Sequence, residues 1–138
     1  MPHLEELIKK AEQGKPKPQF DLGKCYYDGV SVEKDLAKAF YWFSKSAEQG
    51  KHHAQYYLGQ MLRDGEGIEQ NLEKAFYWFE KSAEQGNVRA QNNMGKCYFY
   101  GKGIEKNIPI AKTWFQKAAE KGDFAAKINL RALQEQGY

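Results

Sequence analysis

The sequence has few of the residues that build metal sites, disulfide frameworks or membrane spans. Its 138 residues include two cysteines and three histidines. His52 and His53 are adjacent, and adjacent side chains do not share a helix face, so no zinc site is expected. Apolar runs are short, and even the run 39–43 ends at Ser44. Because a membrane-spanning helix needs about 20 apolar residues, no transmembrane helix is expected.

The sequence also lacks a strong excess of either charge. Lys and Arg number 21 against 18 Asp and Glu, for a net charge of +3. This balance is too mild to predict binding to nucleic acid or to an anionic membrane. Residues 1–7 carry acids where a secretory signal would be basic. We therefore expect a cytoplasmic protein, or a periplasmic or secreted one if an export signal was removed.

What the sequence does have is an internal repeat. Residues 38–50 recur as residues 74–86 with a single change, Ser44 to Glu80, and a looser third copy ends at Gly122. Four glycines close these segments at a spacing of 36 residues, namely Gly14, Gly50, Gly86 and Gly122. A fixed period in this range predicts stacked supersecondary units, each of which needs its neighbours to bury its apolar face.

Each unit reads as two helices. The first helix is expected to stop at a glycine, and the second to begin at an Asp or Asn cap. The second helix carries an apolar stripe, exemplified by Ala39, Phe43 and Ala47. Trp42 and its equivalents are predicted to fill the core beside this stripe, whereas Tyr41 and Tyr77 should be exposed. We expect one domain made of an N-terminal half-repeat helix (3–15), three repeats (16–51, 52–87 and 88–123) and a C-terminal capping helix (124–138).

The two cysteines lie two periods apart, at equivalent positions of the first and third units. Stacked helices are separated by about 8–10 Å per layer, whereas a disulfide needs Cα atoms within about 7 Å. The same position holds Met61 in the second unit, which indicates apolar packing. Cys25 and Cys97 are therefore predicted to be buried thiols that do not form a disulfide.

The repeat unit resembles the Sel-one-like repeat family, a longer-loop relative of the tetratricopeptide repeat. The residues that carry the resemblance are Ala54-Gln55-Tyr56-Tyr57-Leu58-Gly59, Gly65-Glu66-Gly67-Ile68, Asn71 and the segment 74–86. The resemblance implies an all-α fold, a right-handed α-solenoid of antiparallel helix pairs. It also implies protein-binding adaptors, often bacterial, that act in signalling, secretion, host contact or toxin neutralisation. The chain departs from the pattern at Ser31, which replaces the second loop glycine, and lacks the cysteine staples of some members.

The outward face of the first helices is the candidate binding surface. In this fold class the first helices line the concave side, and their outward residues vary between units while the core residues recur. Aromatic residues and arginine are enriched at binding hot spots. The alternative is that Phe20 and Tyr56 pack against the next unit while the rest is solvated. The candidate residues are Phe20, Asp21, Lys24, Tyr27, Asp28, Tyr56, Tyr57, Gln60, Arg63, Asp64, Asn92, Asn93, Lys96, Phe99 and Tyr100.

The predicted function is that of an adaptor, which holds a partner protein or an extended peptide in its concave groove. An alternative is an immunity protein that neutralises a bacterial toxin. An enzyme is less favoured, because neither cysteine has a histidine in a matching register and the Gly-x-Gly loops follow helices rather than strands. We expect no catalytic residue, cofactor, metal, nucleic acid or membrane partner, and a monomeric state.

Overall fold

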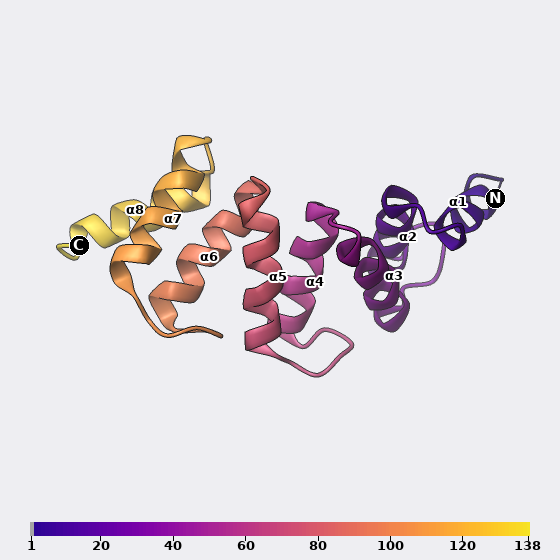
Figure 1. Ribbon diagram of the computed structural model, residues 1–138, viewed down its shortest axis with the longest axis horizontal. Coiled ribbons are helices and arrows are strands. Elements are labelled where there is room, and N and C mark those ends of the chain that lie inside the picture. The colour runs from indigo at the N-terminus through magenta and orange to yellow at the C-terminus, as the bar shows by residue number, and fades with distance from the viewer. Residues whose placement is uncertain (1) are drawn as a thin grey trace. The chain divides into compact units, whose positions relative to one another are not determined.

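The computed structural model describes residues 2–138, which form eight α-helices and no β-strand. All eight lie where the sequence places a first or a second helix (Figure 1). Their bounds are α1 (Pro2–Glu12), α2 (Pro16–Asp28), α3 (Leu36–Glu48), α4 (His52–Asp64), α5 (Leu72–Glu84), α6 (Val88–Tyr100), α7 (Ile108–Glu120) and α8 (Phe124–Glu135).

The same local chemistry sets the helix ends in each repeat. Helices α2, α4 and α6 each end at a glycine in the left-handed region, as at Gly29, where φ is 69°. The second helices α3, α5 and α7 begin after an Asp or Asn whose side chain accepts a hydrogen bond from the backbone N–H three residues on. Each such cap stabilises its helix by about 1 kcal/mol. Short-range sequence signals therefore suffice to fix the helix boundaries.

The chain divides into two compact units, Met1–Gln70 and Asn71–Tyr138. In the first unit, α1 packs on α2, α2 on α3, and α3 on α4. In the second unit, α5 packs on α6, α6 on α7, and α7 on α8. Short loops reverse the chain between successive helices within each unit (Figure 1). The description of residues 1–138 as a single repeat domain stays a prediction.

The core of each unit follows the apolar stripe of its second helices. Ala39, Phe43, Ser46 and Ala47 of α3 are at most 1% exposed. Gly23 of α2 lets the helices approach closely, because a Cβ there would lie 2.7 Å from the Phe43 ring. In the second unit, Phe115 of α7 forms a core with residues of α8.

The three tryptophans differ from their predicted core role, because Trp42, Trp78 and Trp114 are only half-buried. The rings of Trp42 and Trp78 contact the preceding tyrosines Tyr41 and Tyr77, with ring centres 5.0 Å apart in each pair. The Nζ of Lys117 lies 4.7 Å from the ring centre of Trp114, a cation–π contact that suits a half-exposed ring. Tyr41 and Tyr77, at 52% and 48% exposed, confirm the predicted exposure.

The cysteines are partly as expected. No disulfide joins them, and Cys97 is buried. Cys25 is half-buried, which corrects the prediction that both thiols are buried.

Candidate functional site

Four aromatic rings gather in the first unit, from three different helices. They belong to Phe20 and Tyr27 of α2, Phe43 of α3 and Tyr57 of α4, and we call them the α2–α4 cluster. The ring centres of Phe43 and Tyr57 are 5.2 Å apart and stacked. Tyr57 also contacts Phe20 at 5.8 Å and Tyr27 at 5.7 Å. Aromatic pairs at these separations contribute about 0.5–1.5 kcal/mol each beyond the area they bury. Tyr57 is therefore the centre of the cluster.

Lys24 ties the cluster to its charged rim. Its Nζ donates a hydrogen bond to the Tyr57 hydroxyl at 3.1 Å, lies 4.8 Å from the centre of the same ring and pairs with the Asp28 carboxylate at 3.0 Å. Burial lowers the pKa of Lys24, but the bonds to Tyr57 and Asp28 more than offset this and raise the pKa above its ordinary value. The ammonium group is therefore a fixed cation at neutral pH.

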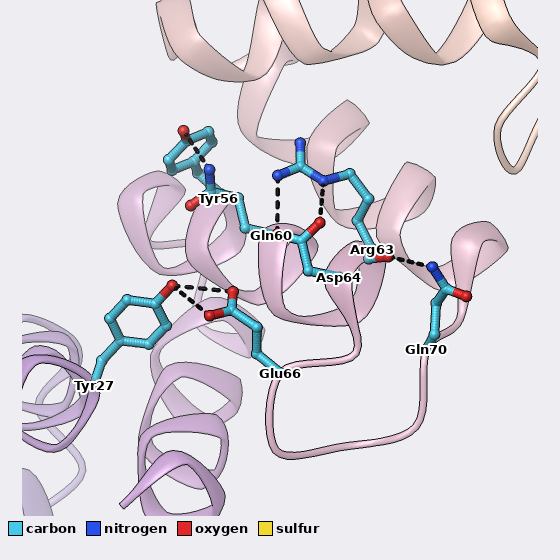
Figure 2. Close-up of polar contacts among 7 residues, drawn as sticks. All are labelled: Tyr27, Tyr56, Gln60, Arg63, Asp64, Glu66 and Gln70. Carbon is cyan, nitrogen blue, oxygen red and sulfur yellow. Dashed lines mark hydrogen bonds and ion pairs between the residues drawn. The ribbon is translucent and has the colours of Figure 1, made fainter. Parts of the chain in front are cut away.

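Tyr27 is held by a carboxylate from the loop after α4. Its hydroxyl donates to both oxygens of Glu66, at 3.0 and 3.1 Å (Figure 2). Burial, followed by the bond to Glu66, raises the pKa of Tyr27 to about 12. Both effects favour the neutral phenol, since burial and a nearby negative charge each disfavour a phenolate. The contact fixes the Tyr27 ring within the α2–α4 cluster.

The raised pKa of Tyr27 gives a testable titration. We expect Tyr27 to ionise at about pH 12, above the ordinary value of about 10. The substitution Glu66→Gln should lower this pKa, because it removes the negative charge beside the hydroxyl. The measurement is an NMR titration of ring-labelled tyrosine, with Tyr27→Phe identifying the signal. An unchanged pKa in Glu66→Gln would contradict the assigned cause.

Helix α4 carries a second set of polar contacts. The Nε2 of Gln60 donates to the Tyr56 hydroxyl at 2.8 Å. The guanidinium of Arg63 donates to the Asp64 carboxylate at 2.9 and 3.1 Å, and the Arg63 carbonyl accepts from Gln70 at 2.7 Å (Figure 2). Arg63 and Asp64 are partly exposed, so they form a paired, solvent-facing charge patch.

Three of the predicted surface residues are buried instead. Tyr56 is 9% exposed, and its ring contacts Tyr57 at 5.5 Å. Asn92 and Asn93 of α6 are 7% and 6% exposed. The Asn92 amide oxygen accepts from Asn129 of α8 at 3.0 Å, so α8 covers it. The predicted exposure is therefore wrong for these three residues.

In the second unit, two of the remaining candidates, Phe99 and Tyr100, line a small hollow. Lys96 and Tyr100 of α6 are exposed, and Phe99 is half-buried. The hollow has a volume of about 90 Å³. The Nζ atoms of Lys102 and Lys106 each lie 5.7 Å from a ring centre, those of Tyr100 and Phe99 respectively. The lining residues are Phe99, Tyr100, Phe115, Asn129, Ala132, Leu133 and Gln136.

The structure thus brings together some of the predicted residues and adds others. Within the first unit, Phe20, Lys24, Tyr27 and Asp28 meet Tyr57, whereas Asp21 pairs with Lys17 at 3.0 Å at the start of α2. Sequence reasoning missed three contributors, Phe43, Glu66 and Asn129. Phe43 was read as core alone, and Glu66 and Asn129 reach their partners over 39 and 37 residues of sequence, which no local pattern reveals.

Burial shifts the pKa values of three reactive side chains. Burial, helped by the negative charges of Asp21 and Asp28, raises the pKa of the Cys25 thiol, which disfavours the nucleophilic thiolate. Burial also lowers the pKa values of His52 and His53. Among the described residues, no group of three His, Cys, Asp or Glu side chains is placed to hold a metal ion. In the same part of the chain, no helix is long and apolar enough to cross a membrane.

The helix pairs recur every 36 residues. Their second helices repeat the same core stripe, whereas their first helices differ from repeat to repeat. These features define an all-α repeat protein of the solenoid class. The family model of the Sel1 repeat matches this sequence three times, at residues 19–51, 52–87 and 88–123. The chain therefore belongs to the Sel1 repeat family. This confirms the resemblance seen in the sequence and the all-α solenoid fold class.

Solved structures and a curated relative agree with this assignment. A Sel1 repeat protein from Oxalobacter formigenes is 33% identical with a TM-score of 0.86, covering 96% of this chain and 99% of its own. The protective antigen c5321 of uropathogenic Escherichia coli, with an SLR fold, is 34% identical with a TM-score of 0.95, covering 97% of this chain and 29% of its own. The secretory immunoglobulin A-binding protein EsiB of E. coli is 43% identical over 44 residues, which span 32% of this chain and 9% of EsiB.

The family sets the general class of function. Sel1 repeats are commonly protein–protein interaction modules, and the repeat is a scaffold that is typically non-enzymatic. The toxin-neutralising role, the cellular compartment and the monomeric state stay predictions.

Proposed function

We propose that this protein binds a partner protein or an extended peptide on the first-helix faces of its two units. The observation that carries the proposal is the α2–α4 cluster, in which hydrogen bonds and ring contacts fix Tyr27 and Tyr57 before any partner arrives. Preorganised aromatic surface binds with a smaller loss of side-chain entropy than mobile side chains do. Tyrosine is also among the residues enriched at hot spots.

Partly exposed charges surround this aromatic surface. The side chains of Lys24 and Asp28 are 34% and 42% exposed, and those of Arg63 and Asp64 are 26% and 45% exposed. Charges at the rim of an interface raise the association rate and fix the register of a partner more than they add affinity. The alternation of signs suits a polypeptide with both acidic and basic residues rather than a nucleic acid, whose backbone is uniformly negative.

The relatives support a protein as the partner. EsiB carries secretory immunoglobulin A binding in its name, and the segment that it shares with this chain is repeat sequence. Since that segment spans 9% of EsiB, the likeness supports the class of partner and not its identity.

The proposal predicts that charge reversal on the first helices weakens binding selectively. The ligand source is a displayed library of random short peptides, selected on the wild-type protein. We expect the double variant Arg63→Glu and Lys96→Glu to bind the selected peptides at least about tenfold more weakly. Each reversal sets a glutamate against a carboxylate of the partner, and like-charge juxtaposition in an interface costs several kcal/mol, where about 1.4 kcal/mol is tenfold in affinity.

The matched control reverses two exposed lysines of the second helices, Lys45→Glu and Lys81→Glu. It has the same change in net charge and should keep wild-type affinity. Circular dichroism checks that both double variants keep their helices. Selection of no peptide at all, or equal weakening in both variants, would contradict binding through the first-helix faces.

A further inference from the structure

The hollow in the second unit occupies the place of a ring in the first unit. A shift of 72 residues, two repeats, relates α2, α3 and α4 to α6, α7 and α8. Under this shift Phe43 corresponds to Phe115 and Lys24 to Lys96. Tyr57, the centre of the α2–α4 cluster, corresponds to Asn129. Phe43 and Lys24, two of the residues around Tyr57, therefore recur in the second unit, whereas the tyrosine itself does not.

Asn129 does not replace that ring. Its Nδ2 donates to the Asn92 amide oxygen at 3.0 Å, which holds the side chain against α6. Beside it lies the hollow of about 90 Å³, lined by Phe115 and Phe99. An engineered cavity of roughly 150 Å³ lined by apolar side chains binds benzene. The hollow can thus take part of an aromatic ring, with the rest of the ring at its mouth beside the exposed Tyr100.

The charges around the hollow also differ from those around Tyr57. Lys24 pairs with Asp28 one turn further along α2, but the corresponding position on α6 is Tyr100, so Lys96 lacks that carboxylate. The Nζ atoms of Lys102 and Lys106 lie over the rings of Tyr100 and Phe99, two residues that line the hollow. Cations therefore accompany two of the lining rings, and this pairing is complementary to an anionic group beside an aromatic one.

We propose that this hollow receives a tyrosine side chain of a partner segment that carries an acidic residue next to it. The incoming ring stacks on Phe115 as Tyr57 stacks on Phe43, and its hydroxyl accepts a hydrogen bond from Lys96, the equivalent of Lys24. The neighbouring carboxylate pairs with Lys102 or Lys106, which lie over the lining rings of Tyr100 and Phe99. This inference rests on the proposed function, and it names one anchor of the partner.

The direct test uses synthetic capped tripeptides as probes. Acetyl-Glu-Tyr-Glu-amide should shift the NMR signals of Phe99, Phe115 and Lys96 in the wild-type protein. Replacing the probe's tyrosine by alanine should weaken binding at least about tenfold, because it removes the side chain that is buried in the hollow and stacked on Phe115. Replacing its glutamates by lysines should also weaken it. Equal binding of all three probes would overturn the proposal.

A second test uses a variant in which the chain itself fills the hollow. The variant Asn129→Tyr supplies the ring from within the chain and should abolish binding of the Glu-Tyr-Glu probe. The probe comparison on the wild-type protein does not depend on how well this variant folds. Unchanged probe binding by a folded Asn129→Tyr variant would overturn the proposal.

Two further outcomes separate this inference from the broader one. If peptides selected from the displayed library bind the wild type and Asn129→Tyr equally, the hollow is not the anchor site, although binding on the first-helix faces stands. If the wild type forms a dimer in sedimentation experiments and Asn129→Tyr does not, the occupant is a second copy of this chain, and the proposal of a separate partner is overturned.

Discussion

The substitution Phe43→Ala is expected to destabilise the protein by about 3–5 kcal/mol, the range for removing a buried phenylalanine ring. Phe43 is 0% exposed and stacks on Tyr57. Its ring also contacts Phe20 at 5.8 Å and Tyr27 at 6.0 Å. Collapse into the space is limited, because Gly23 has no side chain to fill it. The ring therefore supports the core and the α2–α4 cluster together.

The matched control is Tyr41→Ala, two residues earlier in α3. Tyr41 is 52% exposed, and its ring contacts Trp42 and Lys45, so its loss should lower the free energy of unfolding by about 1 kcal/mol, well below the loss for Phe43→Ala. Urea denaturation followed by circular dichroism measures both variants. Binding of the selected peptides should fall in Phe43→Ala under conditions where the variant is still folded. Similar destabilisation by the two substitutions would mean that the ring cluster adds little to the first unit.

Much of the fold follows from the sequence because its determinants are local. A glycine after each first helix, an Asp or Asn before each second helix and an apolar stripe of period 3.6 are read directly from the residues. Each of these residues recurs in every repeat, so a helix boundary predicted in one repeat can be checked against the other two. The helix order and the pairing of α2 with α3 or α6 with α7 follow from these signals alone.

The candidate site was less predictable, because exposure depends on what packs over a face. A helical wheel places Asn92 outward, but its amide is bound by Asn129, and α8 covers it. A helical wheel likewise cannot show that Lys24 donates a hydrogen bond to Tyr57 of α4. The spacing of apolar residues predicts which side of a first helix faces away from its own second helix. It does not predict which side chains of the next repeat contact that side.

The comparison between units explains why the repeats are not interchangeable. Second helices α3 and α5 differ by one residue over 38–50 and 74–86, since the same apolar stripe must be buried in each. First helices change charge and size at equivalent positions, as where Tyr57 is followed two repeats later by Asn129. Packing therefore fixes the second helices, and the first helices carry the differences on which a partner would act.

The substitution Gly103→Ala is expected to destabilise the protein by about 3 kcal/mol or more. Gly103 has a φ of 77°, in the left-handed region, where a side chain costs about 1–2 kcal/mol. A Cβ there would also overlap the backbone carbonyl of Leu72 at the start of α5, and lie 3.1 Å from the Cβ of Phe76. Overpacking of this kind costs about 1–3 kcal/mol, and a backbone carbonyl at a helix start cannot move aside as a flexible side chain can.

The first repeat offers the control at the equivalent position. Ser31 has a φ of 67° and is exposed, so Ser31→Ala keeps the same strained backbone without a new overlap and should change stability by no more than about 0.5 kcal/mol. Urea denaturation of both variants separates the two contributions, because left-handed strain is already present at Ser31 in the native chain. If Gly103→Ala proves as mild as Ser31→Ala, the close approach of this loop to α5 is not required for stability. A large loss for Gly103→Ala alone would identify that approach as the contact that holds the loop of the third repeat onto the preceding second helix.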